Sequence, residues 1–168
     1  MKRSFSIPAG LALLLALPMV NPHVASADPT GPTLVGYQQS TGYVVQRALS
    51  QRNVPFLYGG GNSNGPTRGT GLKANIVGFD ASGLIQYAYA GAGVKMPRTS
   101  AEQCAVGRKV APSQARPGDL LCYGPGGTQS VALYLGSNQM IEATEPAVTV
   151  TTARTTNMVP YLTRVLES

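Results

Sequence analysis

The chain has 168 residues and a formal net charge of +6, from 13 lysines and arginines against 7 acidic residues. Its basic residues are scattered rather than clustered, which argues against nucleic acid as a partner. The length suits one domain with a hydrophobic core and is too short for two ordinary domains.

Residues 1–27 have the pattern of a secretory signal peptide. Lys2 and Arg3 give a positive start, residues 11–17 form an apolar run, and residues 25–27 (Ala-Ser-Ala) form a small-residue cleavage site. The apolar run is too short to span a bilayer. We therefore expect a secreted protein that has no membrane attachment after cleavage; an uncleaved anchor is the alternative. Loss of two of the 13 basic residues leaves 11 against 7 acidic ones, a net charge of +4.

The only histidine, His23, lies inside this predicted signal peptide. The mature chain would therefore contain no imidazole, the side chain that usually activates a cysteine or serine nucleophile.

Residues 28–40 are rich in proline, glycine and polar residues, and we expect them to form a flexible leader. Helices are predicted over residues 42–51, residues 81–90 with Asp80 as the N-cap, and a shorter segment ending near residue 106 with Thr99 or Ser100 as the cap. Between the first two helices, the glycine-rich loop 58–71 is expected to turn sharply and line a groove.

After Gly118 the pattern changes to short apolar segments separated by turns. Strands are predicted over residues 120–123, 130–135, 139–143, 148–152 and 162–166. Helices followed by an antiparallel meander indicate an α+β fold.

Five short motifs occur in a characteristic order. They are Gly-Phe-Asp-Ala-Ser-Gly-Leu at 78–84, Pro-Arg-Thr-Ser at 97–100, Pro-Gly-Asp-Leu at 117–120, Val-Ala-Leu-Tyr-Leu-Gly at 131–136 and Met-Ile-Glu-Ala at 140–143. This order resembles the NlpC family of bacterial cell-wall peptidases over about residues 42–154. The resemblance implies a papain-like domain over residues 41–168, with N-terminal helices packed on a central antiparallel sheet.

The same resemblance implies that the catalytic residues are lost. Ala81 stands where the family has its cysteine nucleophile, and Ser130 stands where it has its histidine base. Glu142 holds the place of the third, orienting residue, and Phe56 replaces a tyrosine associated with substrate binding. Alanine has no nucleophile, and serine accepts no proton near neutral pH, so we expect a degenerate cysteine peptidase that is not an enzyme.

The segments Asp-Ala-Ser-Gly and Gln-Ser-Val resemble one group within the family, the mycobacterial RipD-type proteins, which are regarded as non-hydrolytic binders of peptidoglycan. We therefore expect a secreted protein that binds the peptide stems of peptidoglycan. The predicted binding residues are Phe56, Asp80, Ser82, Arg98 and Glu142.

Arginine side chains are candidates to meet the carboxylates of a peptide stem, because a guanidinium pairs a carboxylate bidentately. Arg98 lies in one of the family motifs and Arg68 lies in the glycine-rich loop. For both, a solvated surface charge is the alternative.

Other functions and sites remain open. An active hydrolase would need an unrecognised nucleophile such as Ser82 or Cys104, and neither has a histidine to activate it. A docking module for another envelope protein is a further alternative. No cofactor or metal is expected, because Asp80, Asp119 and Glu142 lie far apart in the sequence.

The two cysteines, Cys104 and Cys122, leave two interpretations open. An exported chain permits a disulfide, but no sequence feature places these residues within bridging distance. A structural thiol at Cys104 and a small buried apolar side chain at Cys122 are the favoured interpretation.

Overall fold

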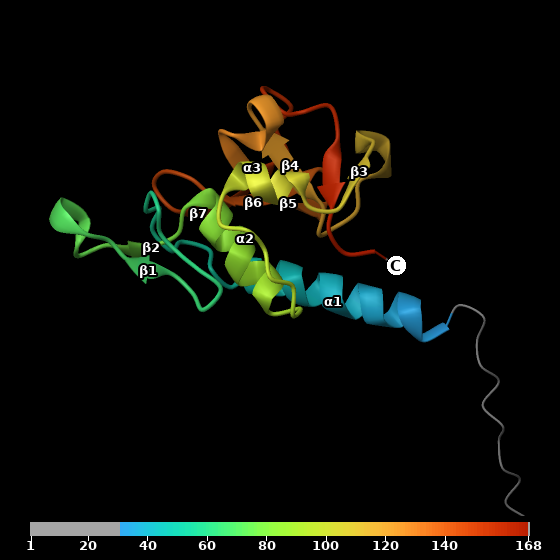
Figure 1. The fold of residues 1–168 in the computed structure, drawn as a ribbon, viewed down its shortest axis with the longest axis horizontal. Helices are drawn as coiled ribbons and strands as arrows, with labels where there is room; N and C mark the ends of the chain where they lie inside the picture. The colour runs from blue at the N-terminus through green and yellow to red at the C-terminus, as the bar shows by residue number, and fades with distance from the viewer. Residues whose placement is uncertain (1–30, 168) are drawn as a thin grey trace, which may run out of the picture.

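The computed structural model describes residues 31–167, so the predicted signal peptide lies outside the described residues. The helices are α1 (Gly31–Leu49), α2 (Ala81–Ala90) and α3 (Ser100–Ala105), with short 3-10 turns η1 (Gly71–Lys73), η2 (Pro112–Gln114) and η3 (Pro125–Gly127) (Figure 1). Within residues 31–167, no helix has both the length and the apolar character needed to cross a bilayer.

The strands form a small ribbon and a larger sheet. The ribbon pairs β1 (Thr67–Arg68) with β2 (Val77–Gly78) and projects from the body of the protein (Figure 1). The larger sheet contains β3 (Arg108–Val110), β4 (Leu120–Tyr123), β5 (Ser130–Gly136), β6 (Gln139–Ala143), β7 (Val148–Thr152) and β8 (Leu162–Arg164). Its order is β3-β8-β4-β5-β6-β7, and every neighbouring pair is antiparallel.

The larger of two hydrophobic clusters lies between the helices and one face of the sheet. From α2, Leu84, Ile85, Ala88 and Tyr89 are fully buried and share one cluster with apolar residues of β4, β5 and β6. Helix α1 packs beside α2 and adds Val44 and Ala48 to the cluster (Figure 1). The predicted α+β fold, with helices packed on an antiparallel sheet, is therefore confirmed.

The predicted flexible leader is wrong for residues 31–40, because α1 already begins at Gly31. The side of α1 that is buried or half-buried continues upstream of Gly42: Tyr37, Thr41, Val44 and Ala48 recur every three or four residues. This spacing lets one helical face pack on the core, which overrides the polar composition of the segment.

Most other boundaries agree with the predictions. Helix α2 and strands β4, β6 and β7 match, and Thr99 caps α3 through a capping box with Glu102. Strand β3 and the β1–β2 ribbon were not predicted, because they contain only two or three residues per strand and depend on pairing with distant segments.

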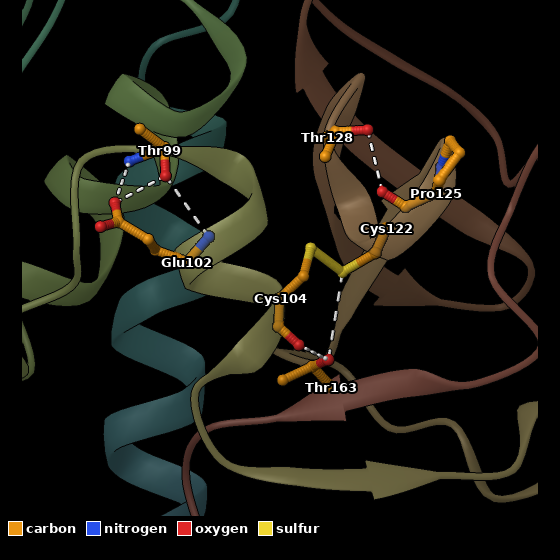
Figure 2. Close-up of a disulfide and its surroundings, with 7 residues drawn as sticks. All are labelled: Thr99, Glu102, Cys104, Cys122, Pro125, Thr128 and Thr163. Carbon is orange, nitrogen blue, oxygen red and sulfur yellow. Dashed lines mark hydrogen bonds between the residues drawn. A yellow bond between two sulfur atoms is a disulfide. The ribbon is translucent and has the colours of Figure 1, made fainter.

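A disulfide joins Cys104 of α3 to Cys122 of β4, with their Cα atoms 6.1 Å apart (Figure 2). The favoured interpretation of two unbonded cysteines is therefore wrong, because packing of α3 on β4 brings together residues 18 positions apart. Gly127 of η3 lies against this bond: it has a φ of +80°, and a Cβ at this position would come 2.5 Å from the Cys104 sulfur. The disulfide thus ties α3 to β4, and the turn before β5 packs closely against the bond.

Candidate functional site: a groove at the start of helix α2

A groove of about 650 Å³ opens where the start of α2 faces the first residues of β5 and the end of β6. Its lining includes all seven predicted site residues: Phe56, Asp80, Ala81, Ser82, Arg98, Ser130 and Glu142. Arg68 is not among the lining residues; it is exposed in β1, and its Nη1 donates to the carbonyl of Ala74 at 3.1 Å.

Asp80 fixes the start of α2 and so places Ala81 at the first helical position. The Asp80 carboxylate accepts a hydrogen bond from the Gly83 amide at 2.7 Å and another from the Gly59 amide at 3.1 Å. A Cβ on Gly83 would collide with the carbonyl of Gly60, so the helix start lies directly against the glycine-rich loop. A thiolate at the Ala81 position would gain from the helix dipole, but the methyl group there has no such chemistry.

The guanidinium of Arg98 is engaged inside the protein. Its Nη1 donates to Asp80 Oδ1 at 2.9 Å and to Ser82 Oγ at 2.7 Å. Its Nη2 donates to Asp80 Oδ2 at 2.8 Å and to the Gly60 carbonyl at 3.2 Å. All four Nη hydrogens are therefore used to hold the loop and the helix start, although the side chain is 37% exposed.

Neither alternative nucleophile is activated. The Ser82 hydroxyl donates to Asp80 Oδ1 at 3.2 Å and accepts from Arg98, and the residue is buried. The neighbouring Asp80 carboxylate is already bonded to the same arginine and to the Gly83 and Gly59 amides, so its oxygens are engaged in holding the helix start. Cys104 forms the disulfide and has no free thiol.

Ser130 and Glu142 form the opposite wall of the groove. Ser130 is the first residue of β5 and pairs with Tyr123 of β4. Glu142 lies in β6 opposite Thr149 of β7, with its side chain only 5% exposed. The sheet therefore brings Ser130, at the position of the family's base, and Glu142, at the position of its orienting residue, into the groove that Ala81 faces from α2.

Arg154 is a groove residue that the sequence reasoning missed. Its Nη1 and Nη2 donate to the two carboxylate oxygens of Glu142, the second at 2.8 Å. Its Cζ lies 4.0 Å from the centroid of the Tyr123 ring, and the Tyr123 hydroxyl donates to the Arg154 carbonyl at 3.1 Å. A single arginine after a predicted strand carries no sequence signal for such a pairing.

The surroundings of Arg154 and Tyr123 raise the pKa of both side chains. The hydrogen bonds to Glu142 raise the pKa of Arg154 above its ordinary value, so the guanidinium stays protonated. Loss of solvent around the phenol raises the pKa of Tyr123 to about 12, so the ring that faces the guanidinium is neutral at physiological pH.

The three carboxylates considered for a metal site are each paired with an arginine instead. The pairs are Asp80 with Arg98, Glu142 with Arg154, and Asp119 with Arg164, the last at 2.8 Å. Among residues 31–167, no group of three or more histidine, cysteine, aspartate or glutamate side chains could hold a metal ion.

Comparison with known proteins identifies the class of domain. The NlpC/P60 family model matches residues 53–167, and the chain belongs to this family. RipB of Mycobacterium tuberculosis, a peptidoglycan endopeptidase, is 46% identical over 163 residues, which cover 94% of this chain and 67% of that protein. RipA of the same organism, also a peptidoglycan endopeptidase, is 42% identical, and the chain spans only 36% of its length.

Two solved structures are more similar in sequence. The P60 domain of a Mycobacterium avium paratuberculosis antigen is 60% identical, with a TM-score of 0.77, covering 81% of this chain and all of that one. RipD of M. tuberculosis is 63% identical, with a TM-score of 0.72, covering 77% of this chain and all of that one. RipD is described as a non-catalytic NlpC/p60 domain protein adapted to peptidoglycan binding.

Three solved structures of mutated RipA allow a comparison of spacing. They carry mutations at a cysteine, at a histidine 49 residues further on, and at a glutamate 12 residues after that histidine. In this chain the same separations, 49 and 12 residues, join Ala81 to Ser130 and Ser130 to Glu142.

Proposed function

We propose that the mature chain is a secreted, non-catalytic protein that binds peptidoglycan at the cell wall, with the groove as the site for its peptide stems. One observation carries this proposal: the helix start that faces Ser130 and Glu142 presents the methyl group of Ala81 in place of a thiol. The sequence after the predicted signal peptide also contains no histidine that could serve as a base.

The expected loss of rate is large. In a serine protease, removal of the nucleophile or the base lowers kcat about a millionfold. Here both positions hold residues without the required chemistry, and Ser82 lacks a free base beside it. Acyl transfer therefore has neither an attacking group nor a proton acceptor.

Binding draws on different groups from chemistry, and these remain in the groove. Asp80 and Arg98 brace the helix start, Phe56 and Tyr58 supply aromatic surface, and Glu142 holds Arg154 on the opposite wall. The likeness to RipD, which is described as peptidoglycan-binding, supports the same function for this chain. The signal-like residues 1–27 support export to the cell wall.

Two assays with purified residues 28–168 test the proposal. Incubation with insoluble peptidoglycan should release no stem-peptide fragments above a buffer control, and the protein should co-sediment with the same material. Fragment release that disappears in Ser82→Ala would support the hydrolase alternative. Absence of co-sedimentation would refute peptidoglycan binding and favour the docking alternative.

A further inference from the structure

The two arginines in the groove differ in how many hydrogen-bond donors they have left. A guanidinium has five N–H donors arranged as two bidentate edges, one formed by both Nη atoms and one formed by Nε and an adjacent Nη. Arg98 uses all four Nη hydrogens on Asp80, Ser82 and Gly60. Only its Nε–H remains, so Arg98 cannot form a bidentate pair of hydrogen bonds with a ligand carboxylate.

Arg154 keeps a complete edge. Its contacts with other side chains of residues 36–167 are the two Nη bonds to Glu142 and the stacking on Tyr123. The Glu142 carboxylate occupies the edge formed by the two Nη atoms, and the ring covers a face of the guanidinium plane. The second edge, Nε with its adjacent Nη, is left without a partner among those residues, and the side chain is 40% exposed and lines the groove.

The guanidinium is also held in place before any ligand arrives. Glu142 is buried in β6, and Tyr123 is buried in β4, so both supports are strand residues of the six-stranded sheet. Arginine has many rotamers, and a binding residue that is already fixed loses less entropy when a ligand binds.

We propose that Arg154 recognises a carboxylate of the peptide ligand through its Nε edge, with Glu142 and Tyr123 as the residues that position it. This inference rests on the proposed function, because it names the group in the groove that selects an acidic peptide stem. Glu142 already neutralises the arginine, so recognition depends on directed hydrogen bonds more than on net charge. A lysine at this position, with one point charge and no planar edge, should therefore not replace the arginine.

The test measures binding of a synthetic stem tetrapeptide by isothermal titration calorimetry, with its carboxylates free or all converted to amides. For the unaltered protein, amidation should weaken binding about tenfold, the usual scale of a charge-assisted hydrogen-bonded contact that is partly exposed to water. The variant Arg154→Gln/Glu142→Gln keeps the net charge and leaves no unpaired carboxylate buried. It should bind the free-acid peptide about tenfold more weakly and respond to amidation by less than about twofold.

A matched control comes from a second arginine–glutamate pair outside the groove. Arg108 contacts Glu167 at 3.0 Å, and both side chains are more than half exposed. Arg108→Gln/Glu167→Gln makes the same chemical change and should leave both affinities unaltered. Arg154→Lys should behave like the groove variant, which separates the bidentate edge from simple charge.

The outcomes distinguish this inference from the proposed function. Full sensitivity to amidation in the Arg154 variants would overturn the assignment to this residue. Equal affinity of the unaltered protein for both peptides would overturn carboxylate recognition, even if a variant failed to fold. In either case, continued co-sedimentation with insoluble peptidoglycan would leave the proposed function standing, whereas its absence would reject the function itself.

Discussion

The two arginine–aspartate pairs should respond very differently when the arginine is replaced by alanine. Arg98 pairs with Asp80 in the groove, and Arg164 pairs with Asp119 between β8 and the turn before β4. Both pairs are bidentate at similar distances, so a count of bonds alone would predict similar costs. The difference lies in the burial of each carboxylate and in the donors that remain to it.

Arg164→Ala removes the cation and most of the hydrogen-bond donors that contact the Asp119 carboxylate. The Asp119 side chain is 1% exposed, and after the change its remaining donor among the described residues is the Arg116 amide at 2.8 Å. Breaking a buried ion pair from one side costs about 3–5 kcal/mol, because the other charge stays buried without compensation. We expect a loss of about 4 kcal/mol in the free energy of unfolding.

Arg98→Ala leaves the Asp80 carboxylate with three hydrogen-bond donors. The carboxylate keeps donors from the Gly83 amide, the Gly59 amide and the Ser82 hydroxyl, and it stays at a helix N-terminus where a negative charge is favoured. Water also screens this pair more, since the Arg98 side chain is 37% exposed. We expect a loss of about 1.5 kcal/mol.

Urea unfolding of residues 28–168, followed by circular dichroism with the disulfide intact, measures both losses. With a slope of about 2 kcal/mol/M, the midpoint should fall by about 2 M for Arg164→Ala and by about 0.8 M for Arg98→Ala. Arg108→Ala, which removes an exposed ion pair, should change it by less than about 0.3 M. Equal falls in the urea midpoint for Arg164→Ala and Arg98→Ala, or a larger fall for Arg98→Ala, would refute this reasoning.

Three further outcomes follow from the same contacts. Alkylation of the new thiol in Ala81→Cys/Ser130→His should be faster than in Ala81→Cys alone, and equal rates would show that the two positions do not face each other. Replacing Cys104 and Cys122 by alanine should cost about 3 kcal/mol in the urea assay, as expected for a loop of 18 residues, and an unchanged midpoint would contradict this. An ultraviolet titration should show a tyrosine ionising at about pH 12 that Tyr123→Phe removes. Because the folded-state pKa is raised, the stability that this phenol adds is complete below about pH 10 and declines as the pH rises towards 12.

Local signals made much of the fold predictable. Helix α2 has a capping aspartate before it and glycines after it, and the strands from β4 to β7 alternate with turn residues. These features act over a few residues, so one sequence is enough to detect them. The start of α1 and the pairing of β3 with β8 depend on packing against distant segments, and composition near residues 31–40 gave the wrong answer.

The residues singled out from the family motifs lie together in the groove, but the motifs did not predict their partners. Asp80 and Arg98 are 18 residues apart, Glu142 and Arg154 are 12 residues apart, and the buried pair at Asp119 spans 45 residues. Which arginine reaches which carboxylate depends on strand order and on the path of each loop, and neither is encoded in a local pattern. For this reason the motifs point to Arg98 as a candidate ligand contact and give no signal for Arg154.

The retention of Glu142 has a physical explanation within the proposed function. In a cysteine peptidase of this family such a carboxylate would orient an imidazole, and at Ser130 there is no imidazole to orient. A buried carboxylate without a partner is strongly destabilising, so Glu142 can persist only if another group compensates its charge. Arg154 supplies that compensation from the segment after β7, and Tyr123 holds the guanidinium from β4. The carboxylate that would orient a base therefore orients a cation in the same groove. Under the proposed function, the framework of a catalytic site would serve as the framework of a binding site.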